Sequence, residues 1–191
     1  MNGKCQLSLN TKCYIQQYEC ILKEMIGKMS SVPLTDSISG SFITQMIPHH
    51  CAAIEMAKNL LQYTTNIPLQ EIALNIVSSQ EKSIKNMKDV LPKCRRFRND
   101  QRQLNYYKRE NERIISEMIC EMKSACTGND IDANFMREMI PHHRGAVRMS
   151  ENALRFCLCP ELVPLLKSII QSQKKGICQM EQLLEQIECS K

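Results

Sequence analysis

The stretch FITQMIPHH at residues 42–50 returns as FMREMIPHH at residues 135–143, an offset of 93 positions. The same offset pairs Tyr14 with Tyr107 and Gln80 with Gln173, so the similarity extends well beyond the motif. A period of this kind has to be recognised first, because a missed repeat distorts every later assignment. We therefore interpret the 191 residues as one unit present twice, with a first repeat at residues 1–98 and a second at residues 99–191.

The two copies have retained particular residue types. Ten of the twelve methionines form five matched pairs, and all four histidines are matched as well; the methionine pairs are Met25 with Met118, Met29 with Met122, Met46 with Met139, Met56 with Met149, and Met87 with Met180. None of the eleven cysteines has a cysteine at the matched position. The property that both halves share therefore depends on methionine and histidine.

Each copy predicts three helices, because apolar residues recur at steps of three and four. In the first copy the helices are expected over residues 12–30, from an N-cap at Ser39 to about residue 63, and over residues 69–91. The second copy repeats the pattern, with Asp132 as the N-cap of its middle helix. Pro48 and Pro141 fall inside the middle helices and predict a kink or a restart there. The fold class is all-α, in two tandem units of about three helices.

The composition is that of a globular protein, with 43% hydrophobic and 24% charged residues. A net charge of +5 is too small to indicate nucleic acid, and the basic cluster between Lys93 and Arg109 reads as a solvated connector in preference to a phosphate-binding patch. The sequence contains no apolar run of about 18 residues, so no membrane span is expected. Met1–Ser8 lacks the apolar run of a secretory signal, which predicts a cytoplasmic protein with reduced thiols, or an exported one if a leader was trimmed.

The middle helix places a histidine between two thioethers. Its residues Phe42, Met46, His49, Ala53 and Met56 are separated by four, three, four and three positions and share one face. The neighbouring histidine is rotated by about 100°. The two imidazoles of one pair should therefore not close on one ion, and one is expected to bind while the other supports it or serves a second site.

This chemistry favours a soft monovalent cation. Thioether sulfur with imidazole suits Cu(I), or Ag(I), far better than calcium, magnesium or manganese. A di-iron site needs Glu-x-x-His, which does not occur in the chain, and zinc is disfavoured because there is no Cys-x-x-Cys. Gln80 and Gln173 could orient an imidazole from the facing helix, or satisfy a polar contact inside the bundle. The alternative is that methionine and histidine only pack the core, although leucine or isoleucine would fill the same space.

The string Met-Ile-Pro-His-His, followed by Ala and Met and closed by Gln, Ile and Met on a later helix, resembles a bacterial family known as the domain of unknown function number 305. The resemblance covers most of the chain in two tandem copies. It implies a ferritin-like helical bundle, and some members look like copper-binding proteins that are commonly exported. Carried over by position, it implies the metal ligands Met46, His49, His50, Met56, Met139, His142, His143 and Met149. Ser83 and Gly176 stand where the family usually has Glu, and its Trp is missing.

These observations predict a protein that binds or buffers a soft metal ion, most plausibly copper(I), and is not an enzyme. The alternative is a structural or interaction module whose basic connector docks an acidic partner. An oxidoreductase is disfavoured because no base, nucleophile or nucleotide motif lies near the histidines; Glu55 comes closest, and its counterpart is Arg148. Separate sites, one shared site and a homo-oligomer all remain compatible with the sequence.

Overall fold

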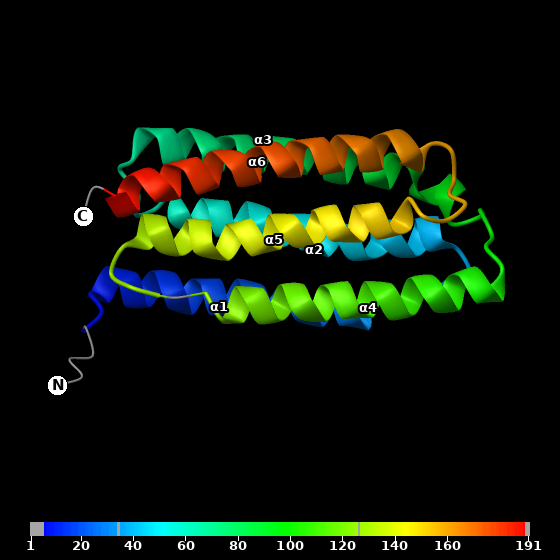
Figure 1. The fold of residues 1–191 in the computed structure, drawn as a ribbon, viewed down its shortest axis with the longest axis horizontal. Coiled ribbons are helices and arrows are strands. Elements are labelled where there is room, and N and C mark those ends of the chain that lie inside the picture. Colours follow the sequence, from blue (N-terminus) through cyan, green and yellow to red (C-terminus); the bar gives the residue numbers. More distant parts are fainter. Residues whose placement is uncertain (1–5, 34, 126, 190–191) are drawn as a thin grey trace.

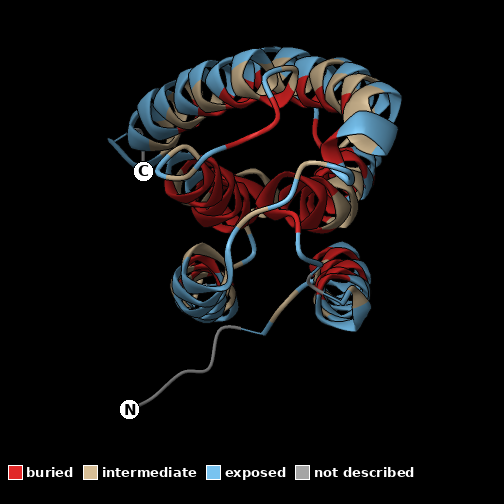
Figure 2. Ribbon diagram, turned by 90° about the vertical axis from the view of Figure 1, so that its right-hand side faces the viewer, coloured by how far each residue is buried: buried red, intermediate tan, exposed pale blue. Residues whose placement is uncertain are grey.

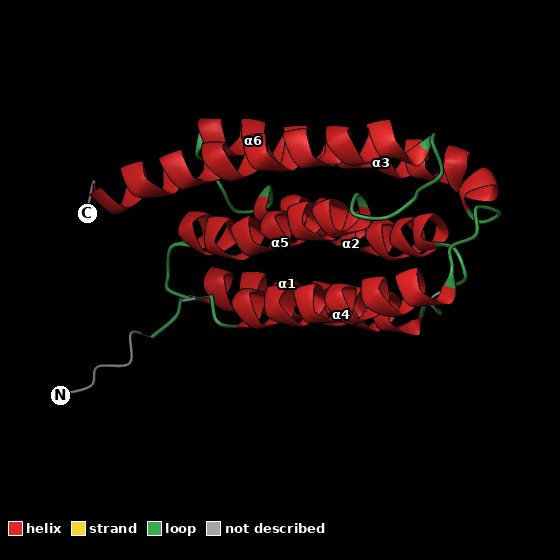
Figure 3. Cartoon of the chain, turned by 45° about the vertical axis from the view of Figure 1, so that its right-hand side comes forward, coloured by secondary structure: helices red, strands yellow, loops and turns green. Residues whose placement is uncertain are grey.

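The computed structural model describes residues 6–33, 35–125 and 127–189, which fold into six helices without any strand (Figure 3). The helices are α1 (Leu9–Ser31), α2 (Ile38–Leu60), α3 (Ile67–Cys94), α4 (Gln101–Lys123), α5 (Ile131–Ala153) and α6 (Leu162–Cys189). Both ends of α5 lie 93 residues after those of α2. The predicted all-α class, with three helices in each copy, is confirmed.

The middle helices begin two residues earlier than predicted. The side chain of Ser37 accepts a hydrogen bond from Gly40 N and caps α2, and that of Asp130 accepts from Ala133 N and caps α5. Ser39 was the wrong N-cap because its hydroxyl accepts a hydrogen bond from Cys159 N instead, at 2.9 Å. The Asp132 carboxyl is likewise engaged elsewhere, by the side chain of Thr64. Helix α2 also ends at Leu60, three residues before the predicted end.

Both middle helices run without interruption through their prolines, so the predicted restart does not occur. A proline inside a helix removes the hydrogen bond to the carbonyl four residues earlier and crowds that carbonyl. Both helices are nevertheless buried along almost their whole length, Phe42 and Phe135 among their fully buried side chains. Tertiary packing supplies most helical stability in proteins, and here it outweighs the lost bond.

The helices form three layers (Figure 1). Helices α2 and α5 pack against each other in the middle layer, α3 packs against α6 on one side, and α1 and α4 lie on the other side, each packed on its own middle helix. Viewed along the helices, burial is concentrated in the middle layer (Figure 2). Because α2 meets α5 and α3 meets α6, the two copies are related by an approximate two-fold axis that passes between the middle helices.

None of the described helices is both long enough and apolar enough to cross a membrane. Met1–Cys5, which belong to the amino-terminal stretch considered above, lie outside the described residues.

Candidate metal centre

The four histidines form one cluster, called the histidine row below, across the contact between the two repeats. The rings of His49 on α2 and His142 on α5 stack with centroids 3.7 Å apart and an interplanar angle of 28°. The His50 ring lies 6.1 Å from that of His49, and the His143 ring lies 6.0 Å from that of His142. The His49 and His142 rings therefore meet at the contact, and His50 and His143 each lie beside one of them. The structure thus brings the histidines of both repeats into one cluster.

The ring nitrogens of this row are buried and only partly engaged. His49 Nε2 lies 3.3 Å from the sulfur of Met118, and His142 Nε2 donates a hydrogen bond to the carbonyl oxygen of His49 at 3.2 Å. Because His142 Nε2 carries the proton, its Nδ1 presents a lone pair. The Nδ1 atoms of all four histidines are buried and have no hydrogen-bond partner within the described residues. A buried acceptor without a partner is costly, and a bound cation would remove that cost.

Burial keeps these imidazoles neutral. It lowers the pKa of His50 to about 3 and that of His142 to about 4. The pKa values of His49 and His143 fall well below the ordinary histidine value, first because of burial and then because of repulsion from neighbouring imidazoles. A metal ion binds the neutral ring, so none of these groups has to lose a proton near pH 7 before it can coordinate.

The methionine that reaches a histidine nitrogen is not among those implied by the resemblance. Met46, Met56, Met139 and Met149 are all buried in the core on α2 and α5, whereas the sulfur beside His49 belongs to Met118 on α4. This contact depends on how α4 packs against the middle layer, which helical spacing alone does not reveal. The retention of Met25 and Met118 as a matched pair was the sequence signal that could have identified it.

Gly145 is what allows Met118 to approach His49. A Cβ atom at Gly145 would lie 2.1 Å from the Met118 sulfur, far inside van der Waals contact. The matched position in the first repeat is Ala52, which already carries a Cβ. The partner methionine Met25 therefore cannot adopt the same pose without a shift, and the cluster is asymmetric about the pseudo-two-fold axis.

The outer histidines meet the two positions at which the sequence departs from the family pattern. Ser83 Oγ lies 3.1 Å from His50 Nε2, and a Cβ atom at Gly176 would lie 3.0 Å from Cδ2 of His143. Gln80 and Gln173 are also buried, but their Oε1 atoms find no hydrogen-bond partner in the described part of the chain. The side chain that engages His50 is thus Ser83 and not the predicted glutamine.

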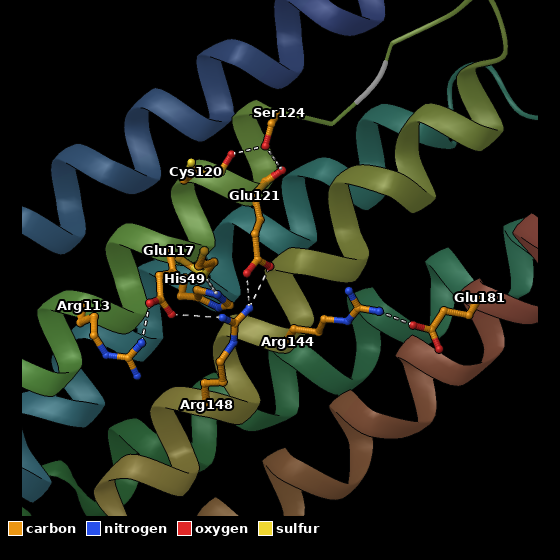
Figure 4. Close-up of polar contacts among 10 residues, drawn as sticks. His49, Arg113, Glu117, Cys120, Glu121, Ser124, Arg144, Arg148 and Glu181 are labelled. Carbon is orange, nitrogen blue, oxygen red and sulfur yellow. Dashed lines mark hydrogen bonds and ion pairs between the residues drawn. The ribbon is translucent and has the colours of Figure 1, made fainter.

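Ion pairs hold the helix that carries Met118 against α5 (Figure 4). Arg148 on α5 donates to both carboxylate oxygens of Glu121 at 2.8 Å and lies 3.5 Å from Glu117, the residue before Met118. Arg113 joins Glu117 from within α4. Because Glu117 and Glu121 flank Met118 on one helix, the pairs that Arg148 makes fix α4 beside the helix that carries His142.

A buried carboxyl group lies next to Met139, and sequence reasoning missed it. Glu138 accepts a hydrogen bond from the Tyr14 hydroxyl at 2.6 Å, and burial raises the pKa of Glu138 to about 8 although that hydrogen bond opposes the shift. Its counterpart Gln45 instead accepts a hydrogen bond from Asn111 at 2.8 Å. The replacement of a glutamine by glutamate at matched positions was the available signal.

The donor set of the cluster is nitrogen and sulfur. Within the described residues no group of three or more His, Cys, Asp or Glu side chains is arranged to hold a metal ion. An ion in the histidine row would therefore rely on two stacked imidazoles and a thioether, which is a soft donor set. The residues present fit a monovalent soft cation and do not fit calcium, magnesium or zinc.

The family whose description reads "Domain of unknown function (DUF305)" matches residues 24–91 and 40–184, so the two matches together span most of the chain. The chain belongs to the DUF305 family. This result confirms the family that the repeated motif resembles. No curated protein matched this DUF305 chain.

Solved structures similar to this DUF305 chain include CopM in several forms. The Ag-bound form of CopM is 32% identical, with 81% of this chain and 98% of that chain covered and a TM-score of 0.58. The Cu(I)-bound form is 31% identical over the same shares, with a TM-score of 0.57. A DUF305 fragment from Deinococcus radiodurans is 24% identical, covers 81% of this chain and 99% of that chain with a TM-score of 0.59, and supports the fold alone.

Proposed function

We propose that this protein binds and buffers a soft monovalent metal ion, Cu(I) in preference, at the histidine row between α2 and α5. The observation that carries the proposal is the stacked pair His49 and His142 with the Met118 sulfur 3.3 Å from His49 Nε2. These groups place imidazole nitrogen and thioether sulfur at one buried point, and the unpartnered Nδ1 atom of His142, whose Nε2 donates to the His49 carbonyl oxygen, leaves a lone pair available.

Two further observations support the choice of ion. CopM, which is 31–32% identical, has been solved with Ag, with Cu(I) and with Cu(II). The imidazoles here are neutral, uncharged donors, and thioethers are uncharged as well, so the ion would keep its own charge in a buried site. That arrangement costs less for a monovalent than for a divalent cation.

The proposed role is storage and not catalysis. The groups around the row serve to position it: Ser83 engages His50, and Arg148 fixes α4. The buried carboxyl of Glu138 hydrogen bonds to Tyr14 and is thereby occupied. We expect an ion held among fully buried side chains to exchange slowly.

The test is an anaerobic titration with Cu(I) in the presence of a chelator that competes for Cu(I). We expect the unmodified protein to take Cu(I) from the chelator, and the double variant His49→Ala with His142→Ala to lose that ion. Met118→Leu, which keeps the side-chain volume but removes the sulfur, should weaken binding at least tenfold. Met136→Leu is the matched control, because Met136 is equally buried but has no methionine at its matched position.

Thermal unfolding separates this role from that of a packing or interaction module. An ion that binds the folded state alone raises the melting temperature as its concentration rises. An unchanged melting temperature with Cu(I) and Ag(I), together with equal chelator competition by the unmodified and double-variant proteins, would reject the metal site and favour the module.

A further inference from the structure

Two cysteines that the repeat does not explain meet at one end of the molecule. Cys94 is the last residue of α3, and Cys159 lies just before α6, at the end where these helices stop and start (Figure 1). Among the nine described cysteines these two are the buried ones; six others are exposed and Cys51 is intermediate. Both cysteines belong to the same buried core, the Lys93–Glu161 ion pair at 3.0 Å joins the segments that carry them, and the Cys159 thiol contributes to the raised pKa of the Cys94 thiol.

Main-chain hydrogen bonds hold both cysteines against the first turn of α2. The hydroxyl of Ser37 donates to the carbonyl oxygen of Cys94 at 2.6 Å, and Cys159 N donates to the hydroxyl of Ser39 at 2.9 Å. Cys159 O in turn accepts from Leu162 N at 3.0 Å, which starts α6. The backbones that carry the two sulfur atoms are therefore fixed before any ligand arrives.

We propose that Cys94 and Cys159 form a second soft-metal site, in which a monovalent cation such as Cu(I) or Ag(I) is held between two thiolates. Thiolate is the protein ligand that most strongly selects Cu(I), and a monovalent ion of this kind accepts two sulfur ligands. When the ion binds, both thiols lose their protons to solvent and two metal–sulfur bonds form. Nothing is oxidised or reduced, and the local charge changes by minus one.

The surroundings of the pair can stabilise that negative charge. The amino-terminal ends of α2 and α6 both lie at the cysteines, and helix amino termini carry a partial positive charge. Arg95 follows Cys94 and packs against Gly40 in the first turn of α2, and Lys93 precedes Cys94. The basic connector identified in the sequence thus begins at this site.

The carboxyl-terminal end of α3, at Cys94, and one acidic side chain oppose the charge. The Cys159 thiol donates to Glu161 Oε2 at 3.0 Å, and Glu161 Oε1 pairs with Lys93 Nζ at 3.0 Å. Burial and the adjacent Cys159 raise the pKa of the Cys94 thiol to about 12. The Cys94 thiol is therefore protonated without metal, and the Lys93 ammonium offsets the carboxylate when the ion enters.

This site is independent of the histidine row. Ser39 and His49 are ten residues apart on α2, which corresponds to about 15 Å along the helix. No side chain of the proposed histidine centre contributes to the thiol pair. Failure of one site therefore leaves the other unaffected.

The experiment compares the unmodified protein with Cys94→Ser/Cys159→Ser and with Cys13→Ser/Cys20→Ser. Cys13 and Cys20 are exposed and lie seven residues apart on α1, which corresponds to about 10 Å along the helix, so these two thiols cannot share an ion. Each protein is titrated anaerobically with Cu(I) under a competing chelator, with a reductant that contains no thiol. We expect the first variant alone to lose one equivalent of Cu(I) together with the ultraviolet absorption of the Cu(I)–thiolate bond. Equal stoichiometry and absorption in all three proteins would overturn the proposal.

Two further measurements distinguish the thiol site from the histidine row and cover the case in which the cysteine variant does not fold. In His49→Ala/His142→Ala the thiolate absorption should persist, which distinguishes this site from the histidine row. If the cysteine variant does not fold, crystals of the unmodified protein soaked with Cu(I) decide: an anomalous peak between the Cys94 and Cys159 sulfur atoms supports the site. A peak in the histidine row without one between the cysteines contradicts it.

Discussion

At the scale of single residues, replacing Gly145 should displace the Met118 side chain. In Gly145→Ala the new methyl group would lie 2.1 Å from the Met118 sulfur, so the methionine must move away from His49. Overpacking of this kind costs about 1–3 kcal/mol. Denaturant unfolding should show that loss, and Cu(I) affinity should fall with it.

The matched control for that change is Gly27→Ala on α1. A Cβ atom at Gly27 meets nothing within 4 Å, and the residue is exposed. Alanine is the better helix former, so this variant should gain about 0.5–1 kcal/mol and bind Cu(I) normally. Equal stability changes in the two variants would show that Met118 is not confined by Gly145.

A second residue-scale prediction concerns the outer histidine of the first repeat. Ser83→Ala removes the hydroxyl 3.1 Å from His50 Nε2 and leaves a buried ring nitrogen without a partner. That loss costs about 1–3 kcal/mol. Ser78→Ala on the exposed side of the same helix should leave the free energy of unfolding unchanged or slightly higher. A Ser83→Ala protein as stable as Ser78→Ala would contradict the assigned contact.

At the scale of elements, the position of α4 on α5 depends on Arg148. Arg148→Ala breaks the pairs with Glu117 and Glu121 that flank Met118, and we expect a loss of about 1 kcal/mol, together with weaker Cu(I) binding. Arg113→Ala removes pairs that lie within α4, so its Cu(I) affinity should stay unchanged. Chelator competition and urea unfolding of both variants check the prediction, and equal Cu(I) affinities would refute it.

The helices themselves could be predicted from the sequence, whereas the side-chain contacts between them could not. Apolar residues at steps of three and four, duplicated at an offset of 93, were sufficient for six helices in two copies. The caps were misplaced because Ser39 bonds to Cys159, a partner 120 residues away. The candidate site has the same origin: His49 and His142 were identifiable from the repeat, but their stacking and the approach of Met118 result from packing across the pseudo-two-fold axis.

At the scale of the whole molecule, acid should destabilise the metal-free protein. Above about pH 6.5 neither the folded nor the unfolded histidines are charged. Below it the unfolded histidines bind protons, whereas His142 and His50 stay neutral in the folded protein until the pH reaches about 4 and 3. Each histidine therefore lowers the free energy of unfolding by up to about 1.4 kcal/mol per pH unit as the pH falls through this window.

Glu138 acts in the opposite direction and provides the control. The pKa of Glu138 in the folded protein, about 8, lies above its ordinary value. The contribution of Glu138 to the free energy of unfolding is therefore full at low pH and is lost as the pH rises from about 4.5 to 8. Glu138→Gln should remove that loss of stability and leave the destabilisation by the histidines below pH 6.5 unchanged. Urea unfolding of both proteins between pH 5 and pH 8.5 measures both effects. A free energy of unfolding that does not change with pH below 6.5 would contradict the buried neutral histidines.

Each repeat should need the contact between α2 and α5 for its stability. Residues 1–98 alone would expose the face of α2 that α5 covers, including the His49 ring that stacks on His142. We expect this fragment to form a homodimer that restores the two-fold contact, which sedimentation equilibrium can measure. A monomeric fragment with the melting temperature of the full chain would show that each repeat is self-sufficient.

The stacked histidines at the axis have a consequence for how such a protein can change over evolutionary time. In an assembly of two identical chains, every replacement near the axis is introduced twice, and a favourable change on one side is imposed on the other. Joining the copies in one polypeptide removes that restriction. Gly145 can face Met118 while the matched residue in the first repeat is Ala52, and two cysteines without matched counterparts can lie at one end of the molecule only. The surroundings of one ion can therefore change while the symmetry-related position stays as it is.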